Sequence, residues 1–367
     1  MIMTLDDLRL KLDALDSQLL TIIAERQALG TEIARVKREV GLPTRDFRRE
    51  REVLLRARDN ATRHGISAAL GEAVMRLLIR SSLTTQERQQ VMAQGRGSGR
   101  TALVIGGAGK MGRWFTSFLL AQGYTVTVAD PLMVETGVAY LPDWRSDALA
   151  QDLIVVATPI KISNEVLLEL AARKPRGLVF DLGSLKTPLR AGLSALRSAG
   201  VRATSIHPMF GPDTDLLTGR HVIFIDLGDS ESLQLAQQLF ASTMAEQVVM
   251  SLDEHDRLIA YVLGLSHAIN ISFFTALANS GENAQRLASL SSTTYDAQID
   301  IATRVAQESP ELYFEIQQLN DYGHESLYAL RAAVEQLCRS VSDNDAQGFK
   351  EMMLKGREYL SGRIREG

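Results

Sequence analysis

The sequence predicts a multidomain protein in which a Rossmann-type α/β domain lies between two all-helical domains. A chain of 367 residues exceeds what one hydrophobic core usually supports. A glycine-rich turn near residue 106 stands between a short apolar run and a helix-length segment, as in dinucleotide-binding folds. The segments before and after this region show helical periodicity. We expect domains at residues 1–93, 101–250 and 251–367, with 94–100 as a linker.

The N-terminal domain is expected to be all-helical. From Leu5 to Val36, apolar residues follow an alternating three-four spacing, which predicts a long helix whose apolar seam needs a partner. Thr4 is a suitable N-cap, and Gly41-Leu42-Pro43 should end the helix because glycine and proline disfavour it. Two further helices are predicted over about 46–64 and 68–90.

The pattern changes twice in the rest of the chain. Residues 94–100 are glycine-rich, polar and without periodicity, which predicts a flexible linker. From about Ser251 onward the spacing is helical again, which predicts a third domain packed against a second copy of the chain. Between them, short apolar runs alternate with amphipathic segments and so predict a parallel sheet with crossover helices: 102–105, 125–129, 153–157, 178–181 and 222–225.

Composition excludes several classes of protein. Hydrophobic residues at 45% and charged residues at 23% are typical of soluble globular proteins. A net charge of -4 gives no general reason to bind nucleic acid or an anionic membrane, although small acidic ligands stay possible. Cys338 is the single cysteine, so we expect no disulfide and no metal site. We find no signal peptide and no stretch long and apolar enough to cross a bilayer, and expect a cytoplasmic protein.

The glycine-rich turn is the firmest motif in the sequence. Glycines at 107, 109 and 112 form a G-x-G-x-x-G pattern between a strand and a helix, which would allow a tight turn, backbone approach to a pyrophosphate and close helix packing. Asp130, at the end of the next strand, would bind a ribose hydroxyl and favour NAD over NADP, or could instead shape a turn before Pro131. The predicted cofactor-binding residues are Gly106, Gly107, Gly109, Lys110, Met111, Gly112 and Asp130.

An arginine interrupts the apolar seam of the first helix. Extending the heptad series from Leu5 places Arg26 where a leucine is expected, and an unpaired buried charge costs several kcal/mol. Arg9 and Lys37 share a heptad position beside it, so the three could bind an anion. Alternatively, Arg26 sets the register of a coiled-coil dimerisation module and pairs with Glu25 or Glu50.

Residues 1 to about 90 resemble the all-helical chorismate mutase family. The resemblance implies a rearrangement of chorismate to prephenate by positioning and electrostatics alone. Arg9 and Arg26 would clamp carboxylates, with Arg9 serving the other subunit's pocket. Lys37 and Gln86 would donate to the ether oxygen, and the hydroxyl side of the ring would face Asp46 and Glu50. The family's pocket maps in order onto Arg9, Arg26, Lys37, Asp46, Glu50, Ser82 and Gln86.

From about Thr101 the chain resembles prephenate dehydrogenases, most sharply at Ile206-His207-Pro208-Met209-Phe210-Gly211-Pro212. His207 follows a predicted strand, and a neutral imidazole suits proton acceptance near pH 7; a structural histidine that caps a turn is the alternative. The resemblance implies that Ser184 orients the histidine or the substrate hydroxyl, although it could instead cap a helix.

The same resemblance assigns residues to the substrate. Arg304 would bind a carboxylate, or be an ordinary surface arginine, and His267 matches a second family histidine. Lys186 could assist substrate anions. Asn270 replaces a histidine of many relatives, and Asp296 departs from a basic residue that some close relatives have. His255 and Asp256 fit a family segment that is structural or near the nicotinamide.

Together the resemblances imply a homodimeric, bifunctional enzyme that converts chorismate to prephenate and then, with NAD, to 4-hydroxyphenylpyruvate, with tyrosine as an inhibitor. One alternative is an arogenate dehydrogenase. Another is a hydroxyacid dehydrogenase or imine reductase with the same architecture, against which the mutase segment and the His207 motif argue.

Overall fold

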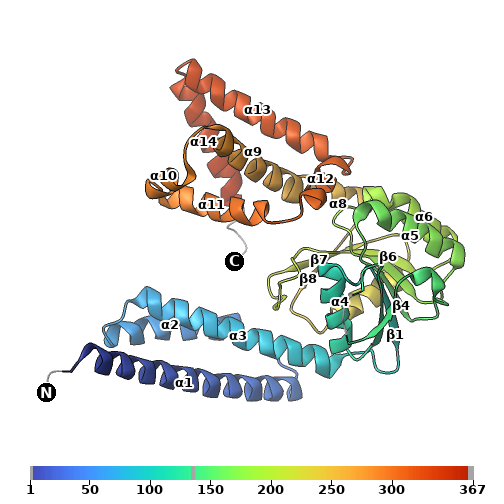
Figure 1. The fold of residues 1–367 in the computed structure, drawn as a ribbon, viewed down its shortest axis with the longest axis horizontal. Helices are drawn as coiled ribbons and strands as arrows, with labels where there is room; N and C mark the ends of the chain where they lie inside the picture. The colour runs from blue at the N-terminus through green and yellow to red at the C-terminus, as the bar shows by residue number, and fades with distance from the viewer. Residues whose placement is uncertain (1–2, 134–136, 363–367) are drawn as a thin grey trace.

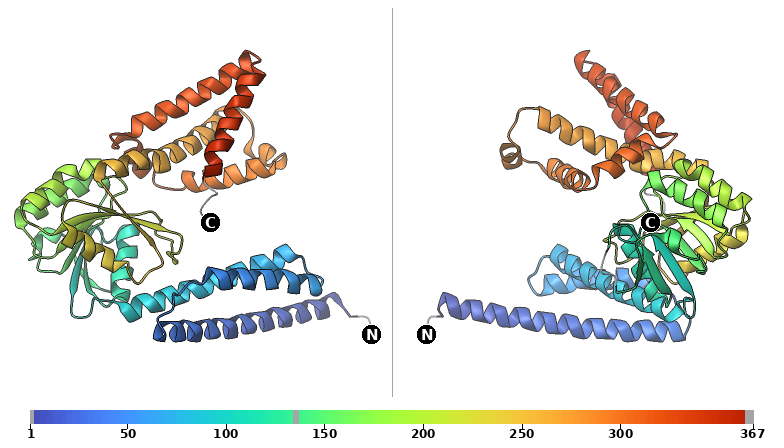
Figure 2. Two further views of the ribbon diagram at one scale, coloured as in Figure 1. Left: turned by 180° about the vertical axis from the view of Figure 1, so that it is seen from behind. Right: turned by 45° about the vertical axis from the view of Figure 1, so that its right-hand side comes forward.

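A computed structural model describes residues 3–133 and 137–362 of the chain. It contains three parts: an N-terminal unit of long helices, a central sheet with helices on both faces, and a C-terminal group of helices (Figure 1). In this view and from behind, both helical parts extend to the same side of the sheet domain (Figures 1 and 2). The predicted fold class is confirmed.

The N-terminal unit contains α1 (Leu5–Glu39), α2 (Phe47–Arg63) and α3 (Ala68–Gln94). Thr4 and Asp7 form a reciprocal capping box at the start of α1, and the side chains of Asp46 and Ser67 cap α2 and α3. The apolar seam of α1 is exposed within one chain, as Leu12 at 59% and Ile22 at 62% show. Such a seam requires a covering partner.

The central sheet has eight strands in the order β3-β2-β1-β4-β5-β6-β7-β8 within the described residues. All neighbouring strands are parallel except β6 and β7, which are antiparallel. All five apolar runs form strands, and β3, β6 and β8 add to them. His207, which was expected just after a strand, lies within β6. The strands are β1 (Thr101–Ile105), β2 (Thr125–Ala129), β3 (Ala139–Leu141), β4 (Leu153–Val156), β5 (Leu178–Asp181), β6 (Ala203–Pro208), β7 (His221–Ile225) and β8 (Glu246–Met250).

Helices cover both faces of this sheet and enclose two apolar cores. One core contains residues of α5 (Ile160–Arg173) and α6 (Arg190–Ser198). The other contains residues of α4 (Lys110–Ala121) and α7 (Ser230–Leu239), and also Val91 of α3. The last turns of α3 therefore belong to the core of the sheet domain.

The C-terminal part begins directly after β8. Its elements are α8 (Leu252–Ile259), a π-helical turn η3 (Ala260–Leu265), α9 (Ser266–Asn279), α10 (Ala284–Ser289), α11 (Thr293–Ala306), α12 (Pro310–Gln318), α13 (Gly323–Ser342) and α14 (Ala346–Ser361). The continuous segment Leu252–Asn279 is long enough to cross a membrane, and an 18-residue window within it has a mean hydropathy of 1.5. The prediction that no stretch could do so is therefore wrong by length and composition. His255 and Asp256, in the first turns of this segment, are fully buried within the protein, and 28% of the apolar window is buried.

The glycine-rich segment between α3 and β1 packs against the sheet domain and does not form the flexible tether predicted from its composition. A Cβ at Gly95 would come within 2.5 Å of the Gln122 carbonyl oxygen, and one at Gly97 within 2.4 Å of Tyr124. The Gly97 N–H donates to the Gln122 carbonyl at 2.9 Å. Glycine is required here for close approach rather than for mobility.

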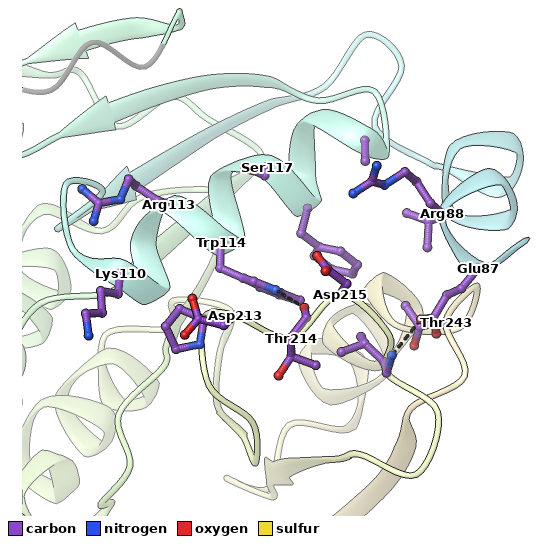
Figure 3. Close-up of a pocket in the computed structure, with 15 residues that line it drawn as sticks. Glu87, Arg88, Lys110, Arg113, Trp114, Ser117, Asp213, Thr214, Asp215 and Thr243 are labelled. Carbon is purple, nitrogen blue, oxygen red and sulfur yellow. Dashed lines mark hydrogen bonds between the residues drawn. The ribbon is translucent and has the colours of Figure 1, made fainter. Parts of the chain in front are cut away.

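A buried carboxylate fixes α3 to the sheet domain. Glu87 is 4% exposed, and its Oε2 accepts a hydrogen bond from the Leu217 N–H at 2.7 Å. Its Oε1 accepts from the Met244 N–H. Figure 3 shows Glu87 reaching from α3 toward the loop that carries Thr214 and Asp215. This β6–β7 loop (residues 209–220) contains the second half of the His207 motif, Met209 to Pro212.

Two candidate active sites

The three N-terminal helices enclose a cavity of about 310 Å³. Six of the seven predicted pocket residues line it, together with Arg49, which the prediction omitted. Its polar lining consists of Arg26, Lys37, Thr44, Asp46, Arg49, Glu50, Ser82 and Gln86, over an apolar surface of Leu29, Ile33, Val53, Ile79 and Leu83. Arg49 follows Asp46 by three residues at the start of α2. Residues three apart on a helix share a face, so this spacing could have identified Arg49 as a pocket residue.

Two of the three cations of this cavity, Arg26 and Lys37, have no carboxylate within 4.0 Å among the described residues, whereas Arg49 pairs with Glu52 at 3.2 Å. Arg26 Nη1 donates to the Ser82 hydroxyl at 3.0 Å and to the Leu78 carbonyl at 3.2 Å. Burial lowers the pKa of Arg26. The proposed partner Glu50 is instead held by Arg45, through two hydrogen bonds of 2.9 Å. Arg26 therefore has unused capacity for an anion.

The remaining polar groups are held by the backbone. Lys37 Nζ donates to the Thr44 carbonyl at 2.9 Å, and Gln86 Nε2 donates to the Gly30 carbonyl at 3.2 Å. Asp46 accepts from the Arg49 N–H at 2.9 Å as the cap of α2. Fixed donors around an apolar cavity suit a small anionic ring compound.

Arg9 lies outside the cavity of its own chain. Its side chain is 68% exposed and pairs with Asp6 at 3.3 Å. Since it precedes Arg26 by more than four helical turns on α1, the two lie about 25 Å apart along the axis. Arg9 can reach such a pocket only in a second copy.

The dinucleotide turn has the steric features that its glycines predict. Gly106 has a φ of +83°, so it, rather than Gly107, supplies the left-handed turn. A Cβ at Gly107 would meet Val128 at 2.4 Å, and one at Gly112 would meet the Gly106 oxygen at 2.3 Å. Gly109 is less crowded, because its nearest neighbour would be the Gly106 oxygen at 3.3 Å. The turn thus leaves the N-terminus of α4 open to a phosphate group.

A largely apolar cavity of about 650 Å³ adjoins this turn. Gly106, Gly109 and Asp130 line it. Asp130 Oδ2 accepts from the Ala108 N–H at 3.1 Å and Oδ1 from the Leu132 N–H at 2.9 Å, so this residue both shapes the turn and faces the cavity. The size, the apolar walls and the single carboxylate fit the adenosine part of a dinucleotide.

Lys110 and Met111 contribute their backbone to the first turn of α4. The Lys110 side chain points into a neighbouring cavity between α3, α4 and the β6–β7 loop (Figure 3). Its Nζ lies 3.7 Å from Glu308 Oε2. Met111 is half-buried.

His207 forms a buried hydrogen-bonded series with two residues of α8. His207 Nδ1 lies 2.8 Å from His255 Nε2, and His255 Nδ1 lies 2.6 Å from Asp256 Oδ1. An ionised Asp256 can only accept, so His255 must donate from Nδ1 and accept at Nε2. His207 therefore donates from Nδ1, and its Nε2 is left as a free acceptor. The sequence offered no spacing that would join residues 207 and 255.

Burial and its neighbours keep His207 neutral. Desolvation, followed by His255 and Lys186, holds the pKa of His207 well below its usual range. Asp256 is oriented by the backbone N–H groups of Lys186 and Thr187, the former at 2.9 and 3.0 Å. His255 and Asp256 are thus positioning residues for His207.

Lys186 is held away from any substrate. Its Nζ donates to Asp181 Oδ1 at 2.7 Å and to the Ile206 carbonyl at 2.9 Å, and both ionic side chains are fully buried. The expectation that Lys186 assists substrate anions does not fit this placement; it supports β6 next to His207. Ser184 is half-buried in the loop after β5 and caps neither of the following helices, whose caps are Lys186 and Leu189.

His267 and Arg304 lie in the C-terminal helices. His267 is half-buried and stacks on Tyr313 with ring centroids 4.1 Å apart. Arg304 is exposed in the single chain, in the last turn of α11. Glu308, two residues after α11, lies near the dinucleotide turn, where it forms an exposed ion pair with Lys110. Arg304 is thus about one helical turn from that contact.

Comparison with known proteins gives the class of the chain. Residues 8–87 match the model of chorismate mutase type II, residues 132–249 the nucleotide-binding domain of prephenate dehydrogenase, and residues 251–355 its dimerization domain. The protein is therefore a chorismate mutase fused to a prephenate dehydrogenase.

Full-length relatives identify the family. A T-protein of Enterobacter agglomerans is 30% identical over 320 residues, 86% of this chain and 82% of that protein. A T-protein of Haemophilus influenzae is 26% identical over 97% of this chain and 92% of its own length. The chain belongs to the T-protein family. The crystal structure of prephenate dehydrogenase from A. aeolicus has the same fold over 73% of this chain and 98% of that one, with a TM-score of 0.57 and 19% identity.

Proposed function

We propose that the N-terminal cavity rearranges chorismate to prephenate and that the second site oxidises prephenate, with loss of carbon dioxide, to the tyrosine precursor 4-hydroxyphenylpyruvate. The observation that carries this proposal is the buried series from Asp256 through His255 to His207, which leaves His207 Nε2 as a neutral acceptor. This is the group needed to hold the hydroxyl of a ring from which hydride departs.

In the mutase site, Arg26 binds a substrate carboxylate through its unpaired guanidinium. Lys37 and Gln86 donate to the ether oxygen as it gains negative charge, while Asp46 and Glu50 face the hydroxyl side of the ring. Ser82 holds Arg26 in place at 3.0 Å. Because the reaction is unimolecular, this preorganised set of donors is sufficient.

In the dehydrogenase site, His207 accepts a hydrogen bond from the ring hydroxyl, and Ser184 orients that hydroxyl or the imidazole. Arg304 and His267 bind the substrate from the C-terminal helices. The cofactor is NAD, which accepts the hydride; Gly106 to Gly112 and Asp130 hold it, and the Asp130 carboxylate disfavours a 2′-phosphate. Release of carbon dioxide is driven by aromatisation of the ring.

The enzyme works as a cytoplasmic homodimer. The exposed seam of α1 and the match of residues 251–355 to a dimerization domain support association of two chains. Feedback inhibition by tyrosine belongs to the same proposal. Turnover of the purified protein with prephenate and with arogenate decides between these two substrates.

Substitution of Arg26 by Ala separates the mutase from a mere dimerisation module. We expect mutase turnover to collapse while the dimer, measured by analytical ultracentrifugation, stays intact. If the Arg26→Ala variant retained mutase turnover while its dimer dissociated, the assignment of Arg26 to the substrate pocket would be wrong. Supplying chorismate with and without NAD then tests both activities. Without NAD prephenate should accumulate, and with NAD the reduced cofactor should form only after prephenate has been made.

A further inference from the structure

A separate cavity of about 310 Å³ lies where the mutase helices meet the β6–β7 loop. Side chains of α2 and α3 form one wall, and Leu216, Thr218 and Arg220 form the other. It shares Glu50, Ile79 and Leu83 with the mutase cavity, so the two cavities adjoin. Neither proposed active site uses it.

This boundary cavity has a strong excess of positive charge. It is lined by four arginines, Arg45, Arg76, Arg80 and Arg220, and by one carboxylate, Glu50. Arg45 already holds Glu50, and Arg76 pairs with Glu72 on its own helix. Over residues 3–133 and 137–362, no carboxylate lies within 4.0 Å of the guanidinium of Arg80 or Arg220.

The charge is local, because the whole chain carries a net charge of -4. Like charges gathered around one cavity repel each other, and a bound anion relieves this repulsion. Guanidinium groups also match carboxylates in shape, through paired hydrogen bonds. The cavity therefore favours an anionic occupant with more than one carboxylate.

Apart from Thr218, the rest of the lining is apolar. Leu54, Ile79, Leu83 and Leu216 form this surface beneath the arginines. An inorganic anion would leave it exposed to water, whereas a carbon ring would cover it. The combination fits a small cyclic acid.

We propose that the boundary cavity binds a small cyclic dicarboxylic acid, in the charge class of the mutase substrate and product; this choice of occupant rests on the proposed function. The two carboxylates are held by Arg80 and Arg220, and the ring covers the apolar surface. Arg45 joins the site to both activities, because it holds Glu50 of the mutase cavity and donates to Thr218 of the β6–β7 loop at 2.7 Å. The cavity is a holding site between the two active sites.

The test uses the full-length protein and the inert ring acid 5-bromoisophthalate. Crystals soaked in it should show bromine density between Arg80 and Arg220, and calorimetry should count this site besides any in the active sites. The double variant Arg80→Gln/Arg220→Gln should lose this density and weaken binding there at least a hundredfold, since each lost charge-assisted contact gives about tenfold. Mutase turnover with chorismate should stay within twofold.

The variant Arg51→Gln is the matched control, because Arg51 is an exposed arginine of α2 outside the cavity. It should bind as the wild type does. Bromine density only in the active sites, or undiminished binding by the double variant, would overturn the proposal. So would complete displacement by an equal concentration of inorganic phosphate, because the ring would then contribute nothing. Bromine density and calorimetry both measure binding. If either catalytic assay of the proposed function fails, these two measurements still decide whether the boundary cavity binds the acid.

Discussion

Substitution of Glu87 by Gln tests whether a mutase helix holds the β6–β7 loop in place. The carboxylate is 4% exposed and accepts one hydrogen bond from the Leu217 N–H and one from the Met244 N–H. A glutamine keeps one acceptor oxygen but turns an amide N–H₂ toward the other backbone donor. One charge-assisted hydrogen bond is lost, at about 1.5–3 kcal/mol, and a buried N–H is left unpaired.

Part of this cost is offset, because desolvation by burial raises the pKa of Glu87 and a neutral amide avoids that penalty. We expect a net loss of about 2 kcal/mol in the free energy that holds the loop. Since about 1.4 kcal/mol corresponds to tenfold in an equilibrium constant, the open loop becomes about thirtyfold more populated.

Hydrogen exchange of the Leu217 and Met244 amides measures this change. Their exchange rates should rise about thirtyfold in Glu87→Gln, and the dehydrogenase rate should fall although the substituted residue lies in the mutase domain. Glu165→Gln, an exposed carboxylate on α5, is the control and should change neither. Unaltered exchange at both amides would refute the reasoning.

Three further substitutions or conditions have defined outcomes. Burial lowers the pKa of His207, so below the ordinary histidine pKa of about 6.5 the unfolded chain binds more protons than the folded chain. The contribution of His207 to the free energy of unfolding is therefore present above pH 6.5 and is lost as the pH falls. The acid limb of dehydrogenase kcat/KM should likewise lie below pH 6.5, and an acid limb above pH 6.5 would contradict the assignment. Lys186→Met leaves Asp181 as an unpaired buried charge and should cost about 3–5 kcal/mol in urea unfolding, with partial recovery on adding Asp181→Asn; equal stability of the wild type and single variant would argue against the ion pair. Asp130→Ser removes the carboxylate at the cofactor cavity and should raise the NADP/NAD ratio of kcat/KM; an unchanged ratio would show that Asp130 only shapes the turn.

The sequence could predict those parts of the fold whose signal is local. Apolar runs such as Leu153–Val156 are buried on both faces, so they are recognisable as strands. The strand β6 is equally buried but contains Thr204, Ser205 and His207, and its polar composition hid it. The strand β3 has only three residues, too few for a pattern.

The two candidate sites also differ in how much of each could be predicted from local sequence patterns. Heptad spacing could group Arg9, Arg26 and Lys37 on one helix, and the family resemblance supplied the other mutase residues. The partners of His207 come from a helix that only tertiary packing brings near. A cation beside a predicted substrate site suggests anion binding, as the sequence does for Lys186. Its buried carboxylate, Asp181, became evident only from the contact of the two side chains.

The separation of Arg9 from Arg26 along α1 has a genetic consequence. If the partner's Arg9 completes each mutase pocket, every pocket draws on two chains, and two defective chains can complement each other. An Arg9→Ala chain supplies Arg26 and an Arg26→Ala chain supplies Arg9, so a mixed dimer contains one pocket with both arginines and one with neither. Coexpression of two inactive alleles should then restore up to half of the mutase activity per mixed dimer, which neither allele can provide alone.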